Sequence, residues 1–285
     1  MEIRDILKEG LIYLKDSEYT NPFFELRLIL SRLFNKDISY LVAHDDTEVP
    51  KDLEKKYFEI LKRRKNGEPL AYIFGECEFY GKKFLVNKNV LVPRKETEHS
   101  VDVLKLILKE KKIKNFLEIG SGTGIVSVIL ALQYEETNFL SVDISKDAIA
   151  NTKKNIDLYN LNNIKVAESN VYSNVTGKYD IIYSNPPYIA SEDIENLQIE
   201  VKQEPRLALD GGPDGLSVYK KIIKDVKRYL NPGGYLVLEI GYNQKEAIEK
   251  LLKDCNTLCI KDISGHDRVI VASEGEIDVR KFRCI

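Results

Sequence analysis

Residues 97–273 alternate between short apolar segments and longer stretches of helical periodicity, and this alternation limits the fold more than any other feature. Strands that alternate with helices predict a mostly parallel sheet covered by helices on both faces, with ligands at the carboxyl ends of the strands. Two last apolar segments, 257–263 and 268–272, predict an antiparallel pair at the sheet edge. The predicted parallel strands are Asn115–Ile119, Phe139–Val142, Ile164–Ala167, Asp180–Tyr183 and Tyr235–Ile240.

A glycine-rich turn follows the first predicted strand and precedes an apolar helix. Its residues are Glu118, Ile119, Gly120, Ser121, Gly122, Thr123 and Gly124. Glycines let the backbone turn tightly and approach a ligand at the start of a helix. The spacing differs from the G-x-G-x-x-G pattern of dinucleotide sites, and the Glu118 carboxylate would repel a pyrophosphate while suiting the ammonium group of a methionine moiety. The turn therefore favours S-adenosylmethionine over NAD as the cofactor.

Two further strand ends carry polar residues suited to a nucleoside. Asp143 follows the second strand, where a carboxylate can accept hydrogen bonds from both ribose hydroxyls, although a charge at the start of a helix is the alternative interpretation. After the third strand, Asn170 can bond the amino edge of adenine and Val171 can cover its ring. An ordinary exit from strand to loop explains these two residues equally well.

The fourth strand leads directly into the tetrapeptide Asn185-Pro186-Pro187-Tyr188. An amide or exocyclic amino nitrogen is a poor nucleophile because its lone pair is delocalised, so a catalyst must hold both N–H groups. The Asn185 side-chain oxygen and the Pro186 carbonyl can each accept one of them, the prolines stiffen the turn, and Tyr188 offers a flat face for stacking. The motif predicts methyl transfer to a planar nitrogen, with Asn185 also bordering the cofactor. A surface turn is the alternative.

Ahead of this α/β region, apolar residues recur at helical spacing as far as about residue 66, which predicts a small helical domain. Pro22 marks a helix start, and Gly67-Glu68-Pro69 ends the last helix. Residues 77–86 predict a β-hairpin. We therefore expect a helical domain over residues 1–66, a linker with a hairpin over 67–92 and a catalytic domain over 93–285.

The overall composition is that of a globular protein, with 43% hydrophobic and 31% charged residues. A formal net charge of -2 argues against a protein that binds mainly by neutralising phosphates. The four cysteines and three histidines are scattered, so neither a disulfide framework nor a metal site is expected. No apolar stretch is long enough to span a bilayer or begins the chain as a signal peptide would, which predicts a cytoplasmic protein.

Taken together, these blocks resemble the protein-(glutamine-N5) methyltransferases of the HemK/PrmC type. The resemblance runs along almost the whole chain and includes the glycine turn, the Asn-Pro-Pro-Tyr motif, residues 67–75, 90–98 and 204–216, and Leu238-Glu239-Ile240-Gly241. Asn-Pro-Pro-Tyr alone is shared with adenine-N6 DNA methyltransferases, whereas the linker and the Glu204-Pro205-Arg206 block are more specific.

The resemblance implies a Rossmann-like class I S-adenosylmethionine-dependent methyltransferase domain joined by the hairpin to the helical domain. It further implies that the substrate is the glutamine of the Gly-Gly-Gln tripeptide in a peptide chain release factor, with the helical domain docking the rest of that protein. Two departures stand out: Asn170-Val171 replaces an expected acidic and aromatic pair at the adenine, and residues 275–285 extend past the last strand.

Three rival functions remain open at this level. An adenine-N6 methyltransferase would stack Tyr188 on a flipped base, but the near-neutral charge and the absence of a recognition motif oppose nucleic-acid binding. A glutamine methyltransferase acting on a ribosomal protein would share the whole catalytic core. A scaffold without activity would have no need of Glu118, Asp143, Asn185 and Tyr188 together.

Overall fold

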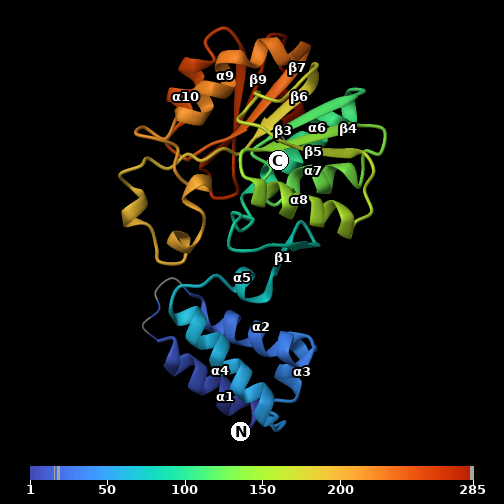
Figure 1. The fold of residues 1–285 in the computed structure, drawn as a ribbon. Helices are drawn as coiled ribbons and strands as arrows, with labels where there is room; N and C mark the ends of the chain where they lie inside the picture. The colour runs from blue at the N-terminus through green and yellow to red at the C-terminus, as the bar shows by residue number, and fades with distance from the viewer. Residues whose placement is uncertain (16, 18–19, 283–285) are drawn as a thin grey trace. The chain divides into compact units, whose positions relative to one another are not determined.

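A computed structural model describes residues 1–15, 17 and 20–282, and most of its helices and strands are labelled in Figure 1. The chain divides into two compact units. The first consists of Met1–Phe74 together with Leu197–Gln203, and the second of Gly75–Asn196 and Glu204–Ile285. The division of the sequence at residues 66 and 92 stays a prediction. Residues 283–285 of the C-terminal extension lie outside the described part of the chain.

The first unit is helical. Pro22 occupies the first position of α2, where its missing N–H is tolerated, and the left-handed Asn35 ends that helix. Side chains from the first four helices form one apolar core, with Ile6, Leu30 and Tyr57 among its buried members. The elements are α1 Ile3–Tyr13, α2 Pro22–Phe34, α3 Ile38–Ala43, α4 Lys51–Lys65 and α5 Leu70–Phe74.

A buried arginine ties the distant segment Leu197–Gln203 into this helical unit. Arg64, near the end of α4, is almost fully buried. Its guanidinium donates to both carboxylate oxygens of Glu25, at 2.7 and 3.1 Å, and to Glu200 at 3.1 Å. A planar guanidinium suits this arrangement because its donors can serve two carboxylates at once. The loop after the Asn-Pro-Pro-Tyr motif is thus partly built into the helical unit.

The second unit contains a seven-stranded sheet in the order β5-β4-β3-β6-β7-β9-β8. The first five strands of that order are parallel, and β9 and β8 add an antiparallel edge. The strands are β3 Asn115–Ile119, β4 Asn138–Asp143, β5 Ile164–Glu168, β6 Tyr179–Ser184, β7 Leu230–Glu239, β8 Asn256–Lys261 and β9 Asp267–Ser273. A separate hairpin pairs β1 Glu76–Phe79 with β2 Lys82–Leu85.

Helices pack against this sheet (Figure 1). Their buried side chains form two separate apolar layers with the strands. One layer packs buried residues of α6 Thr97–Glu110, α7 Ile125–Ala131 and α8 Lys146–Leu158 against the strands. The other uses α9 Ser217–Tyr229 and α10 Lys245–Leu251. Because both faces are covered, the central strands are apolar without alternation, which is what the sequence displays. Short 3₁₀ turns at Ile194–Asn196, Val201–Gln203, Arg206–Ala208 and Val279–Phe282 complete the elements.

The predicted α/β fold is confirmed, including the parallel strands, the hairpin and the antiparallel edge. Several strand boundaries were wrong, and the start of the fifth parallel strand differs most. The fifth parallel strand begins at Leu230 rather than Tyr235, because Leu230 pairs with Tyr179 ahead of a register shift. In the part of the chain that the structure describes, no helix is both long and apolar enough to cross a membrane.

Candidate active site

A cavity in the second unit collects the carboxyl ends of four parallel strands. It lies where β3 and β6 are neighbours, the point at which the strand order reverses direction along the chain. Ligands of open α/β sheets bind at such a switch point. Every residue of the glycine turn from Gly120 to Thr123 lines the cavity, as do Glu118, Asp143, Asn170, Val171, Asn185, Pro186 and Pro187. The structure therefore brings most of the predicted site residues together.

The glycine turn has a backbone that other residues rarely adopt. Gly120, Gly122 and Gly124 all have positive φ, at 77°, 54° and 78°. A Cβ at Gly120 or Gly122 would meet no atom within 4 Å, so these glycines leave open space beside the turn. A Cβ at Gly124 would instead lie 2.7 Å from Thr152 Cγ2 on α8. Gly124 therefore permits close packing, whereas the first two glycines leave room for a ligand.

Asp143 holds this turn from the end of β4. Its carboxylate accepts hydrogen bonds from the backbone N–H groups of Gly122 and Ser145, both at 2.9 Å. Burial raises the pKa of Asp143, and these backbone bonds oppose that rise. A carboxylate has about four acceptor positions, so two bonds leave capacity for a ligand's hydroxyl groups.

Glu118 is buried at the base of the cavity. Its Oε2 accepts hydrogen bonds from Ser127 at 2.5 Å and from Ser141 at 3.2 Å. Loss of hydration on burial raises the pKa of Glu118 to about 7, although both hydroxyls favour the charged form. A cationic ligand group beside Glu118 would favour the ionised carboxylate, which burial disfavours.

The exit from β5 contains a strained residue. Val171 has φ of 55°, an unusual conformation for a β-branched side chain. The Ser169 hydroxyl donates to the Val171 carbonyl at 2.9 Å, and the exposed Asn170 is held through its backbone N–H by Ser173. The surrounding turn thus fixes both residues at the cavity wall, even though the acidic and aromatic pair is missing.

The Asn-Pro-Pro-Tyr motif turns directly out of β6. Asn185 is half-buried, and its Nδ2 donates to the Thr97 hydroxyl at 3.4 Å. Tyr188, in contrast, is not one of the described residues that line the cavity. Its ring packs against the apolar layer of α9 and α10, and burial raises its pKa. Stacking of a substrate on Tyr188 stays a prediction.

The glycine-rich loop of residues 209–215 packs against the Asn-Pro-Pro-Tyr motif. The backbone of Ile189 exchanges hydrogen bonds with Leu209 and Gly211, at 3.1 and 2.8 Å. A Cβ at Gly215 would lie 2.4 Å from the Tyr188 carbonyl oxygen, so this loop approaches the motif as closely as only glycine allows. The loop fixes the direction in which the motif leaves the sheet.

Two further segments line the cavity, and neither of them was predicted to belong to the site from its own residues. Residues 89–97 and 205–208 both contribute lining residues. Glu204 connects the two segments. Its buried carboxylate accepts a hydrogen bond from the Val92 N–H at 2.9 Å and pairs with Arg94 at 2.5 Å. In the sequence, only the family resemblance indicates a role for the Glu204-Pro205-Arg206 block and for residues 93–98.

Comparison with known proteins decides the family. Residues 5–75 match the PrmC N-terminal domain and residues 84–204 the Methyltransferase small domain. A release factor glutamine methyltransferase of Clostridium botulinum is 35% identical over 280 residues, which cover 95% of this chain and 99% of that protein. The chain belongs to the release factor glutamine methyltransferase family.

Two further similarities agree with this membership. A release factor glutamine methyltransferase of Fusobacterium nucleatum is 37% identical over 277 residues, covering 95% of this chain and 78% of its own. A methyltransferase of Pyrococcus furiosus superposes with a TM-score of 0.51 at 18% identity, covering 78% of this chain and 99% of its own, and shows the shared fold alone. The protein is therefore a methyltransferase, and the cavity at the strand ends is its candidate active site.

Proposed function

We propose that the protein transfers a methyl group from S-adenosylmethionine to the side-chain amide nitrogen, N5, of the glutamine in the Gly-Gly-Gln motif of peptide chain release factors. The observation that carries the proposal is the placement of Asn185 and Pro186 on the wall of the same cavity as the glycine turn and Asp143. One part of the cavity thus offers acceptors for an amide, and another offers a nucleoside site.

The cavity fits S-adenosylmethionine in three respects. The open space beside Gly120 and Gly122 admits a ligand against the backbone. Asp143 can receive the ribose hydroxyls, and Glu118 can receive the ammonium group of the methionine moiety. Asn170 and Val171 lie at the cavity wall where the adenine ring would be placed.

The chain's own residues act by holding the glutamine amide. Bound in the cavity, S-adenosylmethionine supplies an electrophilic methyl group, which the nitrogen takes while the sulfur keeps the bonding electron pair. The Asn185 Oδ1 and the Pro186 carbonyl accept the two amide N–H groups and so direct the nitrogen. Orientation of this kind can contribute roughly 7–11 kcal/mol, more than the roughly 10²–10⁴-fold gain typical of a general base. The alkylated nitrogen is acidic enough to lose its proton to water.

Mass spectrometry of a purified release factor, unmethylated at the outset, tests this function. After incubation with the protein and S-adenosylmethionine, we expect one added methyl group, about 14 Da, on the peptide that contains Gly-Gly-Gln. If cofactor binding is demonstrated on the same sample and the peptide stays unmodified, the assignment of release factors as substrate fails. A ribosomal protein and adenine-containing nucleic acid, assayed in parallel, then distinguish the two rival substrates.

The role of Glu118 gives a prediction about pH. Since its pKa is raised to about 7, part of the population is protonated near neutral pH, and a bound ammonium group would favour the ionised form. Binding of S-adenosylmethionine should therefore release a proton below about pH 7, and affinity should fall as the pH falls through that value. Titration calorimetry in buffers of different ionisation enthalpy measures the released proton. The same release from Glu118→Gln would show that another group is responsible.

A further inference from the structure

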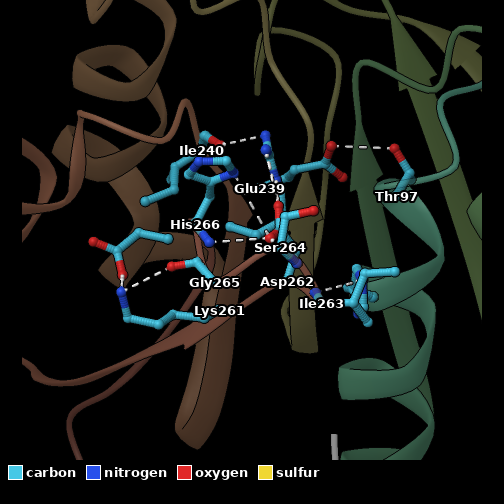
Figure 2. A network of polar contacts seen from close by, with 12 residues as sticks. Thr97, Glu239, Ile240, Lys261, Asp262, Ile263, Ser264, Gly265 and His266 are labelled. Carbon is cyan, nitrogen blue, oxygen red and sulfur yellow. Dashed lines mark hydrogen bonds and ion pairs between the residues drawn. The ribbon is translucent and has the colours of Figure 1, made fainter.

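Three hydroxyl groups surround the carboxylate of Glu239 at the end of β7. Thr97 donates to Oε1 at 3.1 Å, and Ser100 donates to Oε2 at 3.0 Å. Figure 2 marks the contact between Thr97 and Glu239 with a dashed line. Tyr183 also donates to Oε2, at 3.3 Å. Each of the four side chains is 3% exposed or less, so water cannot substitute for these contacts. The sequence alone indicates no role for Glu239, because the residues that bind it are 56 to 142 positions away along the chain.

The carboxylate has a fixed position. The backbone of the next residue, Ile240, donates its N–H to Arg268 at 2.9 Å, and its carbonyl accepts from the Arg268 guanidinium at 3.3 Å. Arg268 is in turn paired with Asp262 in the turn between β8 and β9, part of the network in Figure 2. The end of β7 is therefore held from the neighbouring strand, and Glu239 with it.

The direction of these hydrogen bonds determines how Asn185 is oriented. An ionised carboxylate can only accept, so the single hydroxyl hydrogen of Thr97 is committed to Glu239. The Thr97 oxygen can then only accept from Asn185, which must present its NH₂ group at 3.4 Å. Asn185 Oδ1 consequently points away from Thr97, and an acceptor is what the glutamine amide requires.

We infer that Thr97 and Glu239 are positioning residues, which fix the side-chain amide of Asn185 with its oxygen toward the substrate. The inference rests on the proposed function, because it explains how that function's amide acceptor is kept in the correct orientation. Neither residue needs to touch the substrate. Without the Thr97 hydroxyl, the side-chain amide of Asn185 can rotate by half a turn. It would then present its NH₂ group, a donor, to the N–H of the substrate glutamine. The long Asn185 to Thr97 contact is of the kind that shortens when substrate binds.

Three variants test this inference, measured about one pH unit above the pKa of Glu239, which burial raises to about 7. Thr97→Val keeps the shape of the side chain and removes its hydroxyl, and we expect kcat to fall roughly tenfold with an unchanged dissociation constant for S-adenosylmethionine. Thr97→Ser should restore kcat. Thr137→Val is the matched control, since it makes the same change at a buried threonine whose hydroxyl donates to the Ile113 carbonyl at 2.9 Å, outside this network and outside the cavity lining, and its kcat should stay near that of the unmodified protein.

The outcomes separate this inference from the proposed function. If Thr97→Val turns over normally, or if Thr137→Val loses as much activity as Thr97→Val, the loss does not come from the orientation of Asn185 and the inference is overturned. Should Thr97→Val fail to fold, as thermal unfolding would show, Thr97→Cys provides the same comparison because a thiol is a weak donor and acceptor. An unmodified protein that methylates no release factor would instead contradict the proposed function itself.

Discussion

Asn185→Ala is expected to lower kcat by about 10²–10³-fold, the usual cost of removing one preorganised hydrogen-bonding group from an active site. The substitution removes the Oδ1 acceptor, so only the Pro186 carbonyl remains to direct the glutamine nitrogen. The glycine turn, Glu118 and Asp143 are untouched, and we expect the dissociation constant of S-adenosylmethionine to change by no more than about threefold. Methylation of a release factor under single-turnover conditions and titration calorimetry measure the two quantities.

Asn89→Ala is the matched control for this prediction. Asn89 also lines the cavity, but its side chain is exposed and has no assigned part in holding the amide. Its kcat should be close to that of the unmodified protein. Methylation by Asn185→Ala at the normal rate would contradict the proposed mechanism. An equal loss of cofactor affinity and turnover would place Asn185 mainly in the cofactor site.

The local parts of this site could be predicted from sequence because each depends on a few consecutive residues. A glycine turn after an apolar strand, or Asn-Pro-Pro-Tyr at a strand end, determines its own backbone through φ preferences, and parallel strands bring their ends to one edge. The fold followed from the same periodicity. From these features alone Gly122, Asp143 and Asn185 are expected to share one site, and all three line the cavity.

The remaining parts depend on pairings between distant residues. Glu204 reaches Arg94 across 110 positions, Glu200 reaches Arg64 across 136, and Glu239 reaches Thr97 across 142. Periodicity carries no signal for such contacts, because a charged residue near a strand or helix end is ordinarily a solvated one. The direction of the Tyr188 ring was similarly undetermined, since packing against α9 and α10 decides it.

Asp143→Ala is expected to weaken the binding of S-adenosylmethionine and to leave kcat nearly unchanged, the reverse of the pattern expected for Asn185→Ala. Hydrogen bonds to charged groups contribute about 1.5–3 kcal/mol each, so the loss of two ribose contacts should raise the dissociation constant of S-adenosylmethionine by roughly 10²–10⁴-fold. At saturating cofactor kcat should be nearly normal, because the acceptors for the amide are intact. The variant also leaves the N–H groups of Gly122 and Ser145 without their carboxylate partner, so thermal unfolding must accompany the calorimetry.

Glu168→Ala distinguishes a ribose contact from a general effect of charge. Glu168 is the register partner of Asp143 on the adjacent strand, but it is exposed and forms an ion pair with Lys146 at 3.9 Å. A long-range electrostatic effect would weaken cofactor binding in both variants, whereas direct contact predicts a loss in Asp143→Ala alone. Normal affinity in Asp143→Ala would remove the ribose assignment. A loss of kcat alone in Asn185→Ala, together with a loss of cofactor affinity alone in Asp143→Ala, would show two separable sites in one cavity. One would hold the amide and the other the cofactor.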